Sequence, residues 1–221
     1  MSTLLRREFM EEYGVDLLPY STGNLSLGEI CDWKGLIHQV IDFRHYTLAD
    51  YFPWDEKDIK RINRELSEIK MSNAVFPDME IKNEFESSSD MVIPGTNISL
   101  ENKVDTNAVK SFRFINVKAK VLEGEVRRKL AAGLEVLKEK DFNLYKEKIR
   151  KFWIIESLFY AKDVEISVEK SVSIDLIAEL SSTGLENLKV DHKSGSGKVH
   201  SYVIKGLNCP FAGELVKGRK F

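Results

Sequence analysis

A glycine-rich run near the C-terminal end contains the residue types of a phosphate-binding loop. Residues 194–198 read Ser-Gly-Ser-Gly-Lys, and Val199 follows Lys198. A phosphate loop needs a serine or threonine at that place to hold magnesium, and another glycine five residues before Gly197. The chain has neither. The run therefore predicts a hairpin turn instead of a phosphate site.

Two histidines flank this turn and have the right type for acid and base chemistry. His192 follows Asp191, and His200 lies just beyond Lys198. A histidine base needs a nucleophile to activate, and the chain has no Gly-x-Ser-x-Gly elbow that would present one. Carboxylates alternate along strands or lie on helix faces, where solvent accounts for them. We therefore predict that the protein is not an enzyme, and we rank a dispersed active site last.

Residue types that bind metals also occur, at a spacing that does not suit a compact site. Cys31, His38 and His45 stand seven residues apart, whereas structural zinc sites pair their ligands about two to five residues apart. The chain has two cysteines, Cys31 and Cys209. These observations predict no metal site, no cofactor and no disulfide framework, and they favour a reducing compartment.

Length and composition suit one globular domain. The chain has 221 residues, of which 43% are hydrophobic and 10% aromatic, so we predict a single domain over residues 1–221. Charges arrive at Arg6, before any apolar stretch long enough for a signal peptide, and no later run approaches about 18 apolar residues. We therefore predict a cytoplasmic protein that, as written, is neither secreted nor membrane-spanning.

The formal net charge of −2 hides a basic stretch in the middle of the chain. Residues 1–109 hold 11 basic and 20 acidic side chains, residues 110–151 hold 13 and 6, and residues 152–221 hold 9 and 9. A basic stretch attracts anionic lipid or nucleic acid when it is more than a solvated face. No basic cluster interleaves with the tryptophans to form a base-stacking groove, so nucleic acid is not a predicted partner.

Hydrophobic spacing predicts both helices and strands. Helical periodicity predicts helices over residues 3–13, 55–70, 123–140 and 171–180, with Thr47 capping a further turn that extends to Phe52. Alternation and apolar runs predict strands over residues 36–43, 75–85, 109–122, 153–169, 199–204 and 209–216. Because the strands alternate in polarity and lie in hairpin-like runs, we predict an α+β fold. It would contain a mixed, largely antiparallel, twisted sheet with helices packed on it.

The predicted strand over residues 109–122 changes its buried face. Phe112 and Phe114 share one parity, whereas Val117 and Ala119 share the other. A regular strand keeps one parity on each face. The pattern therefore predicts a bulge or bend near Ile115.

Three strands show one apolar and one polar face, near residues 75–85, 109–122 and 164–169. Val75 belongs to the apolar face of the first strand and is expected to lie against the core. A strand that crosses a membrane also needs about 9 to 11 residues of such alternation. The pattern is therefore typical of a half-buried antiparallel sheet, and it is also compatible with refolding into a membrane pore.

Three stretches share the pattern of one family. Residues 12–19 read Glu-Tyr-Gly-Val-Asp-Leu-Leu-Pro, after a helical opening that contains Phe9. Residues 112–117 read Phe-Arg-Phe-Ile-Asn-Val and precede the helical pattern over Val126–Leu137. Residues 205–212 read Lys-Gly-Leu-Asn-Cys-Pro-Phe-Ala. Together they resemble the bacterial gasdermins, which are pore-forming proteins of bacterial immunity.

The resemblance implies a gasdermin-like pore former of bacterial, antiviral defence that is held soluble until triggered. It implies binding to anionic membrane lipid, self-association on activation and membrane association at that stage. For lipid contact we predict six cations of the basic stretch: Lys110, Arg113, Lys118, Lys120, Arg127 and Arg128. The family generally has a lipidated cysteine near its start and an inhibitory segment at its end. Here the first cysteine is Cys31 and nine residues follow Ala212, so neither feature is carried over.

The alternative interpretation is a non-enzymatic protein-interaction module, such as an effector, an immunity partner or an assembly subunit. Exposed sheet edges and a mobile loop predicted at Ser87–Asp90 would then meet a protein partner. This alternative predicts a stoichiometric complex and no membrane leakage. The pore interpretation predicts salt-sensitive binding to anionic lipid.

Overall fold

The computed structural model describes residues 10, 13–18, 25–34, 40–76, 79–80, 109–169, 189–193, 199–205 and 210–221. The chain divides into two compact units. Unit 1 comprises Met1–Gly23, Asn73–Lys118 and Phe159–Ala212, and unit 2 comprises Asn24–Ser72, Ala119–Leu158 and Gly213–Phe221. The single domain predicted for residues 1–221 stays a prediction. The predicted helices over 3–13 and 171–180, and the Ser87–Asp90 loop, lie wholly or largely outside the described residues.

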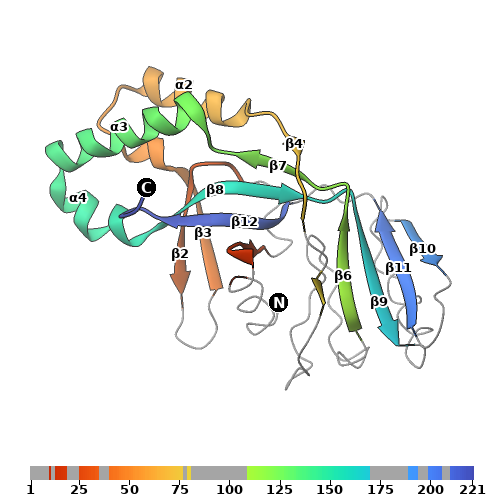
Figure 1. Cartoon of the computed structure of the whole chain (residues 1–221). Coiled ribbons are helices and arrows are strands. Elements are labelled where there is room, and N and C mark those ends of the chain that lie inside the picture. Colours follow the sequence, from red (N-terminus) through yellow and green to blue (C-terminus); the bar gives the residue numbers. More distant parts are fainter. Residues whose placement is uncertain are drawn as a thin grey trace. The chain divides into compact units, whose positions relative to one another are not determined.

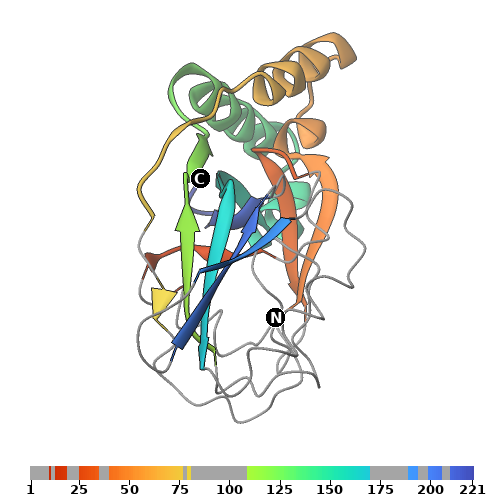
Figure 2. The same cartoon turned by 90° about the vertical axis from the view of Figure 1, so that its right-hand side faces the viewer.

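Unit 1 contains a five-stranded sheet with the order β10-β11-β9-β6-β5, in which each neighbouring pair is antiparallel. Figure 2 shows β6, β9 and β11 running side by side. The strands of this sheet are β5 (Met79–Glu80), β6 (Val109–Ile115), β9 (Asp163–Glu169), β10 (Lys189–Lys193) and β11 (Val199–Lys205). The closing strand predicted over residues 199–204 is therefore confirmed as β11.

The core of unit 1 lies on one face of this sheet. In β9, Val164, Ile166 and Val168 are fully buried, whereas the residues between them are half-buried. Phe112 of β6 stands opposite Ile166 in register, and Phe114 stands opposite Val164. Period-two alternation thus brings the apolar side chains of neighbouring strands onto the same face.

Four phenylalanines close one end of this core. The ring of Phe76 packs edge-on against Phe114, Phe159 and Phe211, with centroid distances of 5.6, 5.2 and 4.9 Å. Phe114 and Phe211 stack with their centroids 3.9 Å apart. Val75, which the sequence pattern placed on the apolar face, is 99% exposed. That prediction is wrong because the larger ring of Phe76 occupies the core and turns its neighbour outward.

The predicted bend near Ile115 is confirmed. The chain leaves β6 and enters β7 (Lys118–Val121) through Asn116, which has a φ of 55°. Phe114 is buried before this residue and Val117 after it, so the buried parity changes there. A single residue in the left-handed region reorients the strand, and asparagine is among the few non-glycine residues that adopt it readily.

The apolar run predicted as one strand over residues 153–169 forms two strands. β8 (Trp153–Tyr160) ends before Ala161, and β9 begins after Lys162. β8 pairs with β2, whereas β9 pairs with β6 and β11. The two strands also differ in burial: β8 has buried residues on both faces, whereas those of β9 lie on one.

A second set of strands, most of whose residues belong to unit 2, has β12, β8, β2 and β3 in that order and β7 beside β8. Its strand bounds are β2 (Glu29–Lys34), β3 (Val40–Thr47) and β12 (Pro210–Lys217). The strand predicted over 209–216 is thus confirmed, whereas the one predicted over 36–43 lies several residues later, as β3. Two short strands, β1 (Asp16–Leu17) and β4 (Ser72–Asn73), pair with β12 and β7.

Five helical elements of the described residues belong to unit 2, where they gather beyond the end at which β2 begins and β3 ends (Figure 1). They are the 3-10 turn η2 (Leu48–Tyr51), α2 (Glu56–Ser67), α3 (Gly124–Lys140), α4 (Phe142–Glu147) and the 3-10 turn η5 (Ile149–Lys151). The turn capped by Thr47 and the helices predicted over 55–70 and 123–140 are confirmed. α4 and η5 were not predicted, because each spans less than two turns and shows no apolar periodicity.

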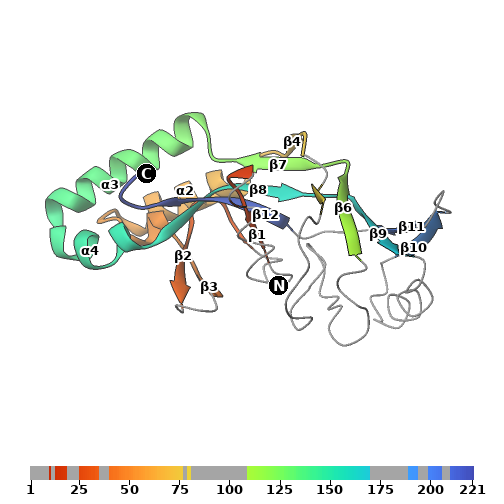
Figure 3. The same cartoon turned by 60° about the horizontal axis from the view of Figure 1, so that its bottom comes forward.

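α2 and α3 lie side by side (Figure 3). Lys129 of α3 donates to both carboxylate oxygens of Glu65 on α2, at 3.2 and 2.9 Å. A side chain on Gly28, just before β2, would lie 3.3 Å from Leu66 and 3.5 Å from Leu130. Both helices therefore pack on the start of β2. With antiparallel pairing and packed helices, the predicted α+β class is confirmed.

Candidate membrane-contact site

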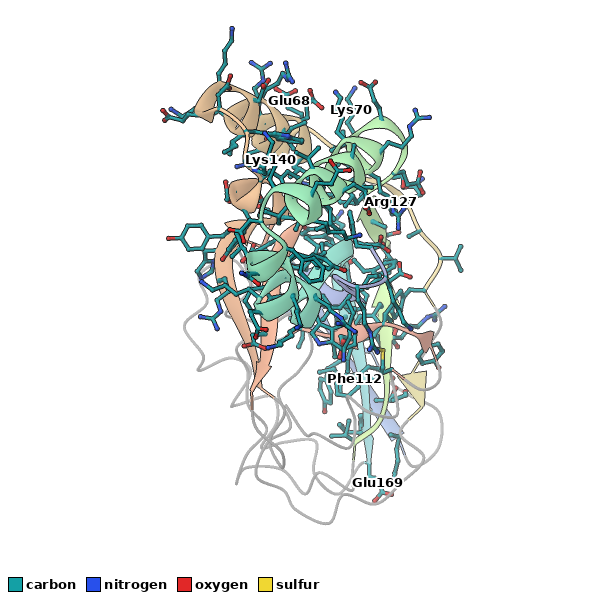
Figure 4. The ribbon with its side chains drawn as sticks, turned by 90° about the vertical axis from the view of Figure 1, so that its left-hand side faces the viewer. Glu68, Lys70, Phe112, Arg127, Lys140 and Glu169 are labelled. Atoms are coloured by element: carbon teal, nitrogen blue, oxygen red, sulfur yellow. The ribbon has the colours of Figure 1, made fainter. Side chains whose placement is uncertain are left out.

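The three predicted lipid-contact cations of unit 1 lie on or beside β6. Lys110 forms an ion pair at 2.8 Å with Glu169, which ends β9 and is labelled in Figure 4. Arg113 is exposed and stands opposite Glu165 in register. Lys118 is exposed at the start of β7. Acidic residues of β9 thus offset much of the positive charge that the sequence places on this strand.

The three predicted cations of unit 2 differ in their exposure to solvent and in their pairing with carboxylates. Arg127 of α3 donates from Nε and Nη2 to Oε1 of Glu156, at 3.0 and 2.8 Å, and its guanidinium lies 5.1 Å from the ring of Phe221. Lys120 is half-buried in β7, whereas Arg128 is exposed on α3. The six predicted residues therefore divide three to each unit, and Lys110 and Arg127 already have carboxylate partners.

A further cluster of positive charge lies elsewhere in unit 2. A cavity of about 470 Å³ is lined by Lys146, Glu147, Arg150, Lys151, Lys217 and Arg219. We call it the basic pocket. The first four residues belong to the basic stretch 110–151, so the sequence signal for them existed. The last two join them only through folding, because they are distant in sequence.

The basic pocket is assembled by α4, η5 and the residues after β12. Lys151 donates to Glu147 at 3.1 Å, and this hydrogen bond holds the pKa of the Glu147 carboxyl below its ordinary value. The ammonium group of Lys217 lies 5.0 Å from the ring of Trp153. Glu147 is the one carboxylate among the six lining residues, so the pocket carries a net positive charge.

A second cavity of unit 2 has a different charge balance. It measures about 200 Å³ and lies against α2 and α3, lined by Trp54, Asp58, Arg61, Ile62, Lys129 and Ala132. Arg61 pairs with Asp58 at 2.7 Å, and Lys129 pairs with Glu65 at 2.9 Å. Its cations are matched by nearby carboxylates, so it does not favour an anion.

A buried carboxylate lies where β2 and β3 begin to pair. Glu29 is 3% exposed and accepts backbone N–H groups from Ser26 at 3.0 Å and His45 at 3.1 Å. Burial raises the pKa of Glu29, although these N–H groups and the nearby His45 ring oppose the rise. His45 holds a φ of 56°, which directs its N–H at the carboxylate across a bulge in the β2–β3 ladder.

The residues singled out for chemistry do not converge in the described structure. Cys31 is buried in β2 with its thiol 3.6 Å from the carbonyl of Trp153, whereas His45 lies at Glu29. Among the described residues, no group of three or more His, Cys, Asp or Glu side chains is placed to hold a metal ion. His38, Cys209 and the turn over residues 194–198 fall outside them.

Helices of membrane-spanning type are likewise not found in the described ranges, where none is long and apolar enough to cross a bilayer. β6 and β9 place apolar residues on the core face, and Lys110, Arg113, Glu165 and Glu169 on the other.

The comparisons with known proteins concern the fold. No family model matches the chain, and no curated protein does. Among solved structures, the chain is similar to a bacterial gasdermin from Bradyrhizobium tropiciagri, with 14% identity, 96% of this chain and 85% of that chain covered, and a TM-score of 0.44. It is also similar to gasdermin A3 in its membrane pore, with 13% identity, 96% and 86% covered, and a TM-score of 0.30. The family found is the one that the sequence resembles.

Proposed function

We propose that this protein permeabilises anionic membranes by inserting amphipathic strands of unit 1, in the manner of a gasdermin-like pore former. The observation that carries the proposal is the regular alternation of β9 within an antiparallel sheet. Its buried residues, Val164, Ile166 and Val168, form one continuous apolar stripe. Its other residues are polar or charged. On insertion the stripe would exchange the protein core for lipid, and the polar face would line water.

The alternation of β9 continues beyond the described strand in the sequence. Val172, Ile174 and Leu176 keep the parity of the apolar stripe, and Ser171, Ser173 and Asp175 keep the parity of the polar face. Lys170 is the one exception at an apolar position. The alternating run of sequence from Asp163 to Leu176 exceeds the about 9 to 11 residues that a membrane-crossing strand needs. Residues 171–176, which belong to the helix predicted over 171–180, would have to become a strand on insertion. The segment therefore has the length and polarity for insertion.

Contact with the membrane is proposed to involve the six cations predicted from the sequence, with unequal contributions. Exposed cations beside anionic lipid contribute about 1 kcal/mol each. Lys118 and Arg128 are exposed, so we expect them to contribute most. Lys110 and Arg127 must first exchange Glu169 and Glu156 for lipid, so their net contribution is smaller.

Self-association on the membrane completes the proposal, because a few inserted strands cannot enclose a water-filled path. We extend it to a role in bacterial antiviral defence, with a soluble state before activation, because the sequence resemblance implies both. Activation would have to detach the apolar stripe from the Phe76–Phe114–Phe211 cluster.

Dye release from liposomes tests this function. Vesicles of anionic and of neutral lipid would be mixed with the intact protein and with a form that lacks residues 218–221. Leakage that requires anionic lipid and falls with added salt supports the proposal. No leakage from either form contradicts it, and a stoichiometric protein complex in the same material would favour an interaction module.

A further inference from the structure

We propose that the basic pocket binds a phosphate group of more than one negative charge, carried by a soluble pyrophosphate-type compound or by a phosphomonoester lipid headgroup. Five cations and one carboxylate line this cavity. Like charges held around one cavity repel one another unless an anion lies between them. Because Glu147 already pairs with Lys151, it offsets little of the charge of the other four.

The lining side chains suit phosphate better than a simple carboxylate. Arg150 and Arg219 each present a planar fork of N–H donors that matches two phosphate oxygens, and Lys146 and Lys217 add point charges. The volume of about 470 Å³ exceeds the space that one small ion fills. We therefore expect a diphosphate, or a phosphate joined to a further group, instead of a single monovalent anion.

A glycine fixes the two halves of the pocket together. Gly218 donates its N–H to the carbonyl of Phe152 at 2.9 Å. A Cβ at this position would lie 2.2 Å from the carbonyl oxygen of Ile149. No side chain fits there, so the close approach of Gly218 to η5 is what brings Lys217 and Arg219 beside Arg150 and Lys151. The positive charge is thus held by backbone packing and does not depend on flexible side chains alone.

The smaller cavity against α2 and α3 shows that positive residues alone do not create such a site. There Arg61 and Lys129 also line the cavity, but each has a carboxylate partner within 3 Å. The basic pocket differs because its cations outnumber its carboxylate five to one. This difference selects the basic pocket as the anion site.

Calorimetric titration of the full chain with pyrophosphate tests the proposal. The Arg150→Gln/Arg219→Gln variant removes both guanidinium forks from exposed positions and should weaken binding on the order of tenfold or more. The matched control, Lys57→Gln/Lys140→Gln, makes the same change in net charge at exposed positions of α2 and α3. The control should bind within about twofold of the unaltered chain. Equal affinity of all three proteins, or no binding by any, would rule out a soluble ligand. The proposal as a whole is overturned if the Arg150→Gln/Arg219→Gln variant also binds phosphatidic acid vesicles as the unaltered chain does.

A second variant separates geometry from charge. Gly218→Ala keeps every cation but must displace the segment from η5, so it should also weaken pyrophosphate binding, with thermal melting as the check on folding. If this variant does not fold, the glutamine variants alone decide the matter.

Co-sedimentation with phosphatidylcholine vesicles, with and without phosphatidic acid, distinguishes the two sources of phosphate. A loss of both pyrophosphate and vesicle binding in the Arg150→Gln/Arg219→Gln variant supports a site open to headgroups. A loss of pyrophosphate binding alone supports a soluble ligand, and a loss of vesicle binding alone supports a headgroup. Because binding is measured and not leakage, failure here leaves the pore proposal standing, and the reverse also holds.

Discussion

Lys162 donates its backbone N–H to the carbonyl oxygen of Ile115, 3.1 Å away. Ile115 ends β6 just before the Asn116 bend, and Lys162 lies in the break between β8 and β9. The bond therefore joins the residue at which the chain leaves the five-stranded sheet after β6 to the residue just before it returns to the sheet as β9. It fixes where β6 and β9 begin to pair, and so which of their side chains share the apolar face.

The bend at Asn116 is expected to depend on the left-handed backbone of that residue. Asn116→Val should destabilise the protein by about 1 to 2 kcal/mol, because a β-branched side chain clashes with its own backbone at a φ of 55°. Asn116→Gly should leave stability nearly unchanged or raise it slightly. Urea unfolding of the two variants measures the difference. Equal stability of the valine and glycine forms would show that the bend does not require this conformation.

Gly133 in α3 should resist substitution although it lies within a helix. Alanine normally stabilises a helix interior by about 1 kcal/mol relative to glycine. Here a Cβ would lie 2.4 Å from two ring atoms of Phe52 and 2.7 Å from Trp54, and overpacking of this kind costs about 1 to 3 kcal/mol. We expect Gly133→Ala to lower the free energy of unfolding by about 1 to 2 kcal/mol.

A double variant provides the control for Gly133. Phe52→Leu should cost stability by itself but should recover part of the Gly133→Ala loss, because the smaller side chain leaves room for the added methyl. Thermal and urea unfolding of the four proteins gives the coupling. Simple additivity of the two losses would contradict the contact.

Glu29 should make stability depend on pH in a defined direction. Burial raises its pKa in the folded protein above the ordinary value of 4.5, so the folded chain holds this proton more tightly than the unfolded chain. The stability contributed by Glu29 is therefore complete below pH 4.5 and is lost as the pH rises through the folded pKa. Relative to Glu29→Gln, the unaltered protein should lose stability as the pH rises from 4.5 through the raised folded pKa.

Chemical unfolding of both proteins across this pH range measures the difference. Glutamine does not titrate, and all other titrating groups are common to the two proteins. The difference between their pH dependences therefore reports Glu29. A difference that stays constant with pH, or grows in favour of the unaltered protein as pH rises, would show that the burial of Glu29 does not govern its titration.

The sequence predicted the elements whose burial is periodic, and missed those that depend on distant contacts. Ile62 and Leu66 recur with helical spacing and proved to be the buried positions of α2, and the parity change around Ile115 located a true bend. The prediction that Val75 lies against the core was wrong, because alternation does not show which of two adjacent apolar residues is buried. Phe76 occupies the core through contacts with Phe211, which lies far along the chain.

The candidate sites were likewise predicted only where they depend on residues close together in sequence. The cations of residues 110–151 were evident in the sequence, but the partners Glu169 and Glu156 that offset two of them come from other strands. The basic pocket needed Gly218 to bring the end of the chain onto η5. No local pattern encodes such a contact, because it depends on backbone atoms of residues about 70 positions apart.

The most direct test of strand insertion is to label four consecutive residues that lie shortly after β9 in the sequence. Ser171, Val172, Ser173 and Ile174 would each be replaced by cysteine in a Cys31→Ser/Cys209→Ser background and labelled with a polarity-sensitive fluorophore. On anionic vesicles that contain a lipid-confined quencher, we predict quenching at Val172 and Ile174 and none at Ser171 and Ser173. Neighbouring positions that respond alike, or labels that do not respond to the vesicles, would contradict insertion of an amphipathic strand.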